Sequence, residues 1–474
     1  MIHYNQHLID GDMRTATSAA TTTIHDSTTE APIASVAHGS ASEVDAAVVA
    51  ARRAFAHWAN TSVDERASYL RAIADALEAR SDRMADAVVA EVGMPLKLAR
   101  RIQVQAPIAA WRAAASLAAD ALAQMRVAHS VITKEPVGVV AAITPWNYPL
   151  HQITAKLAAA LAAGCCVVLK PSELAPGVVG ALCEAVLEAR LPRGVLNIVH
   201  GDRATGAALV AHPGIDMVSF TGSTVAGKQI AATAGAELKR VALELGGKSA
   251  SIALPDADQA MVVKHALSSC MLNSGQTCSA ITRLIVPEAQ YAAYREQLRQ
   301  GVAKLRVGDP RDADSRIGPL VAADHRRRVQ AYIARAEQAG HDDIAIDVKP
   351  DVPARGYFVA PAIFGRVPIG AELAQEEVFG PVLAVQTYST EDEDEAVALA
   401  NGTTYGLAGA VWSASAEHAQ RVARRMRAGQ IDINGAPFNA LAPFGGFGAS
   451  GTGREGGAFG IEEFTELRAI QLAQ

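Results

Sequence analysis

The chain has few cysteines and no apolar run long enough to cross a membrane. Its five cysteines are an odd number, and Cys165 and Cys166 are neighbours, so a disulfide framework is not expected and a reducing cytoplasm fits. The longest apolar stretch, residues 157–169, is interrupted by Gly164 and is shorter than the roughly 20 residues of a spanning helix. Residues 1–12 lack the basic and apolar regions of a secretory signal. We therefore expect a cytoplasmic protein without a membrane partner.

Charge is also sparse, and neither sign dominates. Charged residues make up 19% of the chain, and the formal net charge is −6. Because phosphate binding relies on clustered Lys and Arg, this balance argues against a nucleic-acid partner. The densest basic run, residues 325–328, is interrupted on both sides and predicts a solvated helix face. The thirteen histidines show no ligand-spaced pairing, so no metal site is expected.

What the chain does have is a large apolar interior arranged in alternating units. Its 474 residues are 50% hydrophobic, which predicts two or three lobes. Short Val/Ile runs at 137–143, 167–169, 195–199 and 217–220 alternate with Ala-rich helical stretches. This alternation predicts parallel βαβ units, and hence an α/β fold with a doubly wound domain.

Local signals place several element boundaries. Helices are expected to begin near Ser42 and Ser62, each followed three residues later by an acidic residue, as in a capping box. A helix ending at Ala163 with Gly164 as its stop should precede a buried strand. The Thr-rich residues 15–29 predict an irregular surface excursion.

Two glycine-flanked motifs carry the chemistry. Cys278 lies in Asn-Ser-Gly-Gln-Thr-Cys-Ser at 273–279, and Glu244 lies in Leu-Glu-Leu-Gly-Gly-Lys at 243–248. Alone, a cysteine is more often a buried apolar residue and a glutamate a surface group. Together they suit a reaction in which sulfur forms a covalent intermediate and a base later activates water.

These motifs resemble those of the NAD(P)-dependent aldehyde dehydrogenase family. Five further segments match family motifs in the family's order, at 144–149, 169–173, 220–224, 376–381 and 443–446. The resemblance runs from about Ile9 to the C-terminus. One departure is Phe-Gly-Ala-Ser at 447–450, where many members carry an aromatic residue followed by lysine, near the substrate entrance.

The resemblance implies an architecture and an assembly. It places an NAD-binding domain at residues 1–120 and 137–244, a catalytic domain at 245–445, and a small β oligomerisation arm at 121–136 and 452–474. In the family such an arm builds homodimers or homotetramers. From composition alone, the segments 126–133 and 464–472 are equally consistent with ordinary edge strands.

The cofactor implied is NAD. By resemblance Lys170 and Glu173 hold the adenosine ribose, and a carboxylate at Glu173 would repel the 2′-phosphate of NADP, which stays open as an alternative. Gly222 and Ser223, between a strand and a helix, suit a pyrophosphate, although alone they are an ordinary helix cap. Glu377 and Phe379 resemble the pair that grips the nicotinamide ribose. The remaining cofactor-binding candidates are Trp146 and Leu245.

The reaction implied is oxidation of an aldehyde to a carboxylic acid with NAD and water. Cys278 is the nucleophile, and the Asn147 amide with the Cys278 backbone N–H would bind the oxyanion. Glu244 would activate the hydrolytic water. Lys156 and Glu455 match positions that relay protons in some relatives, and an ordinary ion pair is an equal alternative.

The substrate is expected to be a medium-sized or aromatic aldehyde. Ala155 is small where relatives that prefer small aldehydes carry a bulky aromatic residue. Helical spacing after Asn147 predicts one face lining a substrate tunnel, and packed helix residues are the alternative. The substrate-lining candidates are Tyr148, His151, Gln152 and Ala155 on this face, with Leu272, Thr277 and Phe438 opposite.

Two other functions stay open on sequence grounds. An acylating relative would pass the acyl group to coenzyme A, but such enzymes generally lack a base at the position of Glu244. A catalytically silent binding or structural protein on this fold would not need Cys278, Glu244 and Asn147 together. The Gly-x-Gly-x-x-Gly match at 446–451 lacks a following strand-turn-helix unit, so it predicts a flexible loop over the substrate mouth rather than a dinucleotide fingerprint.

Overall fold

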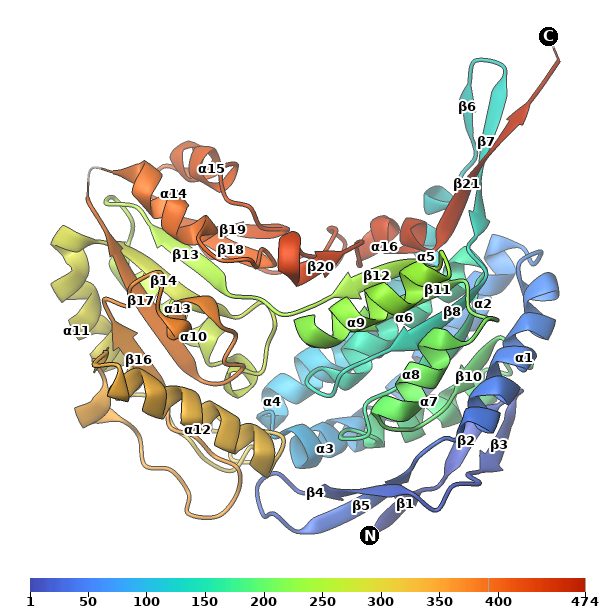
Figure 1. Ribbon diagram of the computed structural model, residues 1–474, viewed down its shortest axis with the longest axis horizontal. Helices are drawn as coiled ribbons and strands as arrows, with labels where there is room; N and C mark the ends of the chain where they lie inside the picture. The colour runs from blue at the N-terminus through green and yellow to red at the C-terminus, as the bar shows by residue number, and fades with distance from the viewer. Residues whose placement is uncertain (391, 474) are drawn as a thin grey trace.

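The chain folds into two α/β lobes and a protruding β arm (Figure 1). The computed structural model describes residues 1–390 and 392–473. Each lobe is built around one large sheet, and the two sheets have eight and seven strands. This is the α/β class with a doubly wound domain that the Val/Ile runs predict.

The first lobe contains the eight-stranded sheet. Its strand order is β20-β12-β11-β8-β9-β10-β2-β3, with the five central strands parallel and the outer three antiparallel. The bounds are β2 Gln6–Ile9, β3 Asp12–Thr15, β8 Val139–Ile143, β9 Cys166–Lys170, β10 Leu196–Ile198, β11 Met217–Thr221, β12 Arg240–Glu244 and β20 Gly451–Thr452. All residues of β8, β9 and β11 are buried, as expected of parallel strands covered on both faces.

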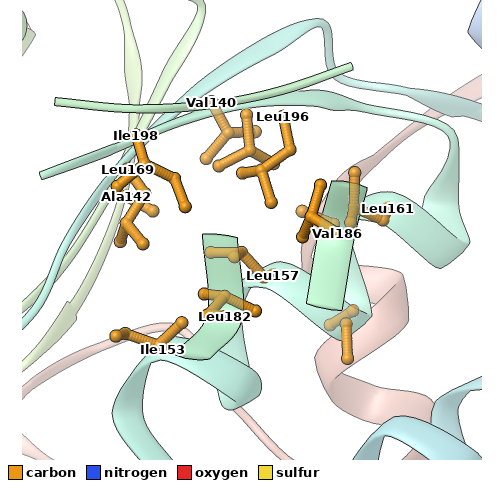
Figure 2. Packing of buried hydrophobic residues seen from close by; sticks show 14 of the residues in the cluster. Val140, Ala142, Ile153, Leu157, Leu161, Leu169, Leu182, Val186, Leu196 and Ile198 are labelled. Carbon is orange, nitrogen blue, oxygen red and sulfur yellow. The ribbon is translucent and has the colours of Figure 1, made fainter. Parts of the chain in front are cut away.

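Helices cover both faces of this sheet (Figure 1). Their bounds are α1 Ala41–Trp58, α2 Val63–Glu78, α3 Ser81–Val92, α5 Ala106–Ala121, α6 Pro149–Ala163, α7 Gly177–Glu188, α8 Arg203–Ala211, α9 Thr224–Ala236 and α16 Gly457–Glu463. Figure 2 shows Leu157 of α6 and Leu182 of α7 packed beneath strand residues such as Val140 and Leu196. Burying a leucine side chain contributes about 1.5–3 kcal/mol, so this layer fixes α6, and with it Asn147 just before the helix.

The second lobe is organised around the seven-stranded sheet, in the order β15-β16-β17-β14-β13-β18-β19. The strands are β13 Ser249–Ala253, β14 Ile281–Pro287, β15 Asp342–Asp343, β16 Ala362–Gly365, β17 Val382–Tyr388, β18 Ala408–Trp412 and β19 Gln430–Ile433. The helices are α10 Gln259–Cys270, α11 Tyr291–Val302, α12 Ala323–Gln338, α13 Glu372–Gln375, α14 Glu393–Asn401 and α15 Ala416–Ala423.

The arm is a three-stranded antiparallel sheet, β21-β7-β6, that projects from the first lobe (Figure 1). It consists of β6 Met125–Val127, β7 Ser130–Pro136 and β21 Thr465–Gln471. Leu467 is 70% exposed on it, and Met125 and Val127 are also exposed. Apolar side chains on a projecting sheet are typical of an assembly surface.

Two boundary predictions hold, and two need correction. Ser62 caps α2 by accepting the Glu65 N–H at 3.1 Å, and Gly164 ends α6 at φ 95°. The first helix starts at Ala41 rather than after Ser42, because Ser40 is its cap and its N–H donates to Glu43 Oε2 at 2.8 Å. The prediction of irregular structure at 15–29 is wrong for the middle of that segment.

Residues 15–29 contain a regular strand. Its residues, Thr21–His25, form β4, which pairs with β5 Pro32–Ala37. Strand β5 also pairs with β1 Ile2–Tyr4. The threonines are β-branched and suit an extended backbone.

A short segment of the first lobe contacts the second lobe. It comprises α4 Leu96–Leu98 and a π-helix, η1 Ala99–Gln105, and the Leu96 N–H donates across the lobes to Pro310 O at 2.8 Å. Among the described helices, none is long and apolar enough to cross a membrane. The described residues also contain no cluster of three or more His, Cys, Asp or Glu arranged to hold a metal ion.

Candidate active site

The predicted site residues follow the carboxyl ends of neighbouring parallel strands. Asn147 follows β8, Glu173 follows β9, Ser223 follows β11, and Glu244 is the last residue of β12. In an open α/β sheet this edge is where ligands bind. The second lobe faces it with the loop that carries Cys278.

That loop has a strained backbone. Asn273 and Ser274 have φ of 51° and 58°, and Gly275 follows at 79°. Such left-handed conformations cost of order 1–3 kcal/mol each outside glycine and persist only where neighbouring contacts impose them. Ser274 Oγ donates to Gly318 O at 2.8 Å, and Gln276 Oε1 accepts the Val321 N–H at 2.9 Å. These contacts fix the loop, and with it Cys278.

Asn147 is held by hydrogen bonds to both its side chain and its backbone carbonyl. Its side-chain Nδ2 donates to Gln276 O at 2.9 Å, which ties it directly to the cysteine loop. Its backbone carbonyl accepts Gln103 Nε2 at 2.8 Å and Asn273 Nδ2 at 3.0 Å. Gln103 is fully buried in η1 and was missed from sequence, because nothing in its local pattern distinguishes it from a surface glutamine.

Cys278 lies in a low-dielectric and acidic environment. Its backbone carbonyl packs against Gly247, where a Cβ would approach to 2.5 Å, so a side chain at 247 would displace the loop. Burial raises the pKa of the Cys278 thiol to about 12, and the charges of Glu377 and Glu244 add to the rise. Formation of the thiolate therefore requires a nearby positive charge, or protonation of the neighbouring carboxylates, to lower the pKa of the thiol.

Glu244 is a buried carboxyl group whose oxygens both lack a hydrogen-bond partner among the described residues. Burial raises its pKa well above the usual range, and the nearby Glu455 charge adds to this. Glu455 in turn forms a buried ion pair with Lys156, with Nζ and Oε1 at 2.6 Å. An unpartnered carboxyl with a raised pKa suits a general base near neutral pH.

The glycine-rich segment at 446–451 is anchored to the strand that carries Glu244. Its end forms β20, in which Gly451 pairs with Glu244, and Ser450 Oγ donates to Gly246 O at 2.7 Å. This end of the segment is therefore regular structure rather than the predicted loop. Gly445, just before the segment, leaves room for Glu244, because a Cβ there would approach Oε1 to 2.6 Å.

The adenosine-side candidates form a connected group. Lys170 Nζ donates to Gly201 O at 2.6 Å and lies 3.5 Å from Glu173 Oε2, which is partly exposed. Ser223 caps α9 by accepting the Ala226 N–H at 3.3 Å, and Gly222 precedes it. The nearby Thr221 hydroxyl is buried without a partner among the described residues. This set of groups fits a dinucleotide, because the partly exposed Glu173 carboxylate can accept ribose hydroxyls and the N-terminus of α9 suits a phosphate.

The nicotinamide-side candidates surround Gly246 and Gly247. Glu377 Oε1 accepts the Gly247 N–H at 2.9 Å, and burial raises the pKa of Glu377 to about 7. A Cβ at Gly246 would approach Glu377 Oε2 to 2.5 Å. Leu245 is buried beside Gly227 of α9. Glu377 can therefore occupy this position only because residues 246 and 247 are glycines.

Trp146, His325 and Phe379 form an aromatic cluster that no local sequence pattern predicts. The Trp146 ring centroid lies 5.5 Å from His325 and 5.6 Å from Phe379. Phe379 has φ 60°, and its carbonyl lies 2.8 Å from His325 Nε2. The basic run at 325–328 is helical as predicted, within α12, but His325 is packed rather than solvated. Its spacing of four from buried Val329 is the signal that could have identified it.

The substrate-lining candidates fall into two groups. Tyr148 Oη and Thr277 Oγ1 are 2.7 Å apart, and the Tyr148 and His151 rings lie 6.4 Å apart. Gln152 is buried, whereas Ala155 is partly exposed. Leu272 and Phe438 instead line a larger groove that does not include those five residues. Phe438 is 54% exposed, with its ring 6.0 Å from Phe444.

Comparison with known proteins places these motifs in context. A sequence model described as the aldehyde dehydrogenase family matches residues 14–470. The chain is 42% identical to a 3-succinoylsemialdehyde-pyridine dehydrogenase of Pseudomonas sp. and 40% identical to a geranial dehydrogenase of Castellaniella defragrans, with 99% of both chains covered in each case.

Solved structures are similarly close. One is a cysteine-to-alanine mutant of aldehyde dehydrogenase C from Pseudomonas syringae, complexed with NAD+ and octanal. It has a TM-score of 0.95 and 41% identity, covering 99% of this chain and 96% of that one. A Mycobacterium tuberculosis aldehyde dehydrogenase complexed with NAD+ has a TM-score of 0.95 and 36% identity, covering 100% and 99%.

Proposed function

Because the chain belongs to the aldehyde dehydrogenase family, we propose that it oxidises an aldehyde to the carboxylic acid with NAD and water, through a thioester on Cys278. The observation that carries the proposal is the buried, unpartnered Glu244 carboxyl, whose charge acts on Cys278. A carboxyl group left without partners is costly to stability. Such a cost is typical of a group reserved for chemistry.

The first step is attack of the Cys278 thiolate on the aldehyde carbon, which forms a C–S bond and an oxyanion. The Asn147 Nδ2 amide and the Cys278 backbone N–H are the donors for that oxygen. Asn147 is pre-positioned for this by Gln103, Asn273 and Gln276. One such donor lowers the activation barrier by about 2.7–4 kcal/mol.

NAD supplies the hydride acceptor when bound, and the residues suited to hold it are those described above. Glu173 and Lys170 suit the adenosine ribose, Gly222 and Ser223 the pyrophosphate, and Glu377, Phe379, Trp146 and Leu245 the nicotinamide end. Glu173 disfavours a 2′-phosphate by like-charge repulsion. NAD is therefore the preferred cofactor, with NADP the weaker alternative.

The second step is hydrolysis of the Cys278 thioester. Glu244 takes a proton from water, the hydroxide attacks the acyl carbon, the C–S bond breaks, and the carboxylic acid leaves. The Lys156–Glu455 pair adjoins Glu244 electrostatically. We assign it to passing the proton onward from Glu244.

The preferred substrate is a medium-sized or aromatic aldehyde. Ala155 is small and partly exposed, which leaves volume beside His151 and Gln152. The substrates in the names of similar proteins, such as geranial and octanal, are of this size. The exposed apolar side chains of the β arm support assembly into a homodimer or homotetramer through that arm.

An absorbance assay for NADH formation tests the proposal. Wild-type protein should reduce NAD in the presence of an aldehyde panel, whereas Cys278→Ala should not, although it retains NAD binding. Cys270→Ala, a change at a buried cysteine of α10 outside the site, is the matched control and should stay active. Dependence on coenzyme A would instead favour an acylating enzyme, and no NADH with any aldehyde would favour a silent binding protein.

A further inference from the structure

A large groove lies between the π-helix η1 of the first lobe and helices α10 and α11 of the second. Its volume is about 1520 Å³, larger than the roughly 300–1000 Å³ of a usual small-molecule pocket. Part of its wall is apolar. This part includes Leu98, Ile102, Val263, Leu267, Met271 and Leu272.

Another part of the wall is basic. Six exposed cationic side chains line it, and none has a carboxylate within ion-pair distance among the residues described. They are Lys97, Arg101, Lys264, Lys304, Arg311 and Arg316. Arg100 also lines the groove but is paired with Asp82 at 3.0 Å. The acidic residues of the lining are Asp312, which pairs with Arg306, and the half-buried Asp432.

This excess of positive charge contrasts with the whole chain. The protein has a net charge of −6, and about half of its arginines lie within ion-pair distance of a carboxylate among the described residues. Unpaired cations concentrated along a concave wall create a local positive potential, which attracts anions and weakens with added salt. The groove is therefore electrostatically complementary to an anionic ligand.

The groove also adjoins the catalytic machinery. Leu272 belongs to the short helix Leu272–Gly275 that precedes Cys278. On the other side, Arg101 and Ile102 of η1 line the groove, while the next residue, Gln103, points inward and donates to the Asn147 carbonyl. Phe438, expected to line the substrate path, lies on its rim. An apolar chain that extended from Cys278 past Leu272 would enter the groove.

We infer that this groove receives the anionic far end of the substrate, so that long-chain aldehydes bearing a terminal carboxylate are favoured over uncharged aldehydes of equal length. The inference rests on the proposed aldehyde oxidation at Cys278. The apolar wall takes the chain, and Arg101 and its neighbours take the carboxylate. Short oxo-acids gain nothing, because their carboxylate would lie among the apolar residues before reaching the cations.

The test compares unbranched alkanals with oxo-carboxylic acids of the same carbon number, from four to twelve carbons, by kcat/KM with NAD. The oxo-acid should be the poorer substrate when short and the better one when long. Exposed ion pairs contribute up to about 1 kcal/mol each, or up to about fivefold. The doubly substituted Arg101→Gln/Arg316→Gln protein should therefore lose roughly tenfold for the long oxo-acid and little for the matching alkanal.

Two controls isolate the charge effect. Arg71→Gln, an exposed arginine of α2 outside the groove and without an ion pair among the described residues, should behave as wild type. Raising sodium chloride from about 0.05 to 0.5 M should remove most of the oxo-acid advantage. If alkanals are turned over normally but the oxo-acid advantage is absent, or survives the double substitution, the inference is overturned.

Failure of the proposed reaction is separable from failure of the groove assignment. If no aldehyde yields NADH, the proposed function fails, and calorimetric titration with decanedioate tests the groove by itself. Binding that the double substitution weakens and Arg71→Gln does not would support an anion-binding groove. Equal binding to all three proteins, or none, would overturn it. Decanol titrated in parallel shows whether the apolar wall alone accounts for binding.

Discussion

Gln103 Nε2 donates a hydrogen bond of 2.8 Å to the backbone carbonyl of Asn147. Gln103 lies on a π-helix, a rare geometry that often occurs at functional sites, and it is fully buried. Asn147 in turn contacts the cysteine loop through Gln276. Gln103 is therefore a positioning residue that couples η1 to the oxyanion donor.

Replacing Gln103 with Leu should lower kcat by roughly three- to tenfold, since one buried hydrogen bond contributes about 0.5–1.5 kcal/mol. Asn273 keeps its own bond to the same carbonyl, so the loss should be partial. The KM for NAD should change little, because the side-chain hydrogen bond of Gln103 goes to Asn147 and not to a cofactor candidate. Gln330→Leu, an exposed change on α12, is the control. A fall in thermal stability with unchanged kcat would assign Gln103 to folding alone.

Replacing Glu173 with Ser should raise the ratio of kcat/KM for NADP to that for NAD. The carboxylate that repels a 2′-phosphate is removed, and Lys170, 3.5 Å away, becomes available to the phosphate. A change of about tenfold or more is expected for the loss of one close like-charge contact. An unchanged ratio would mean that Glu173 does not face the ribose.

Replacing Ala155 with Trp should fill the space assigned to the substrate. The kcat/KM for a benzaldehyde-like substrate should fall about 10- to 200-fold more than that for acetaldehyde. This corresponds to roughly 1–3 kcal/mol of transition-state binding, as expected when a pocket loses a small apolar volume. Equal losses for both aldehydes, or none, would place Ala155 away from the substrate.

Stability should depend on pH through Glu91. This buried carboxyl accepts the Gly177 N–H on both oxygens at 3.1 Å, and burial raises its pKa to about 8. A carboxyl whose folded pKa lies above its unfolded value favours the folded state only while protonated, so its contribution falls as pH rises from about 4.5 to 8. Glu91→Gln should therefore lose less thermal stability than wild type between pH 5 and 9. Parallel pH dependence of the two melting temperatures would contradict this.

Much of the fold follows from local sequence because its signals agree. The buried runs that became β8, β9 and β11 are continuous and β-branched, and Gly164 supplies the left-handed stop of α6. The start of the first helix was misplaced because two neighbouring residues could each cap it. Ser40 and Ser42 are both acceptable caps, and only the position of Glu43 decides between them.

The candidate site was predictable only in part, for a physical reason. Cys278, Glu244 and Asn147 are marked by motifs: glycines flank Cys278 and Glu244 so that the backbones can approach, and prolines flank Asn147. Gln103 and His325 act through contacts between segments far apart in the chain, and no local pattern encodes such contacts. The cationic groove likewise combines both lobes, so its charge is invisible until the chain is folded.

The most direct test of the central claim, a Cys278 thioester hydrolysed with the help of Glu244, is a rapid-mixing experiment on Glu244→Gln. Without the base, acylation should still occur, giving a burst of about one NADH per subunit and then a stall. Mass spectrometry of the stalled protein should find the acyl group on Cys278. In wild-type protein, the deacylation rate should rise with pH, because burial raises the pKa of Glu244 and its deprotonated form is the active base. The absence of both burst and adduct, or an adduct on another cysteine, would contradict the account.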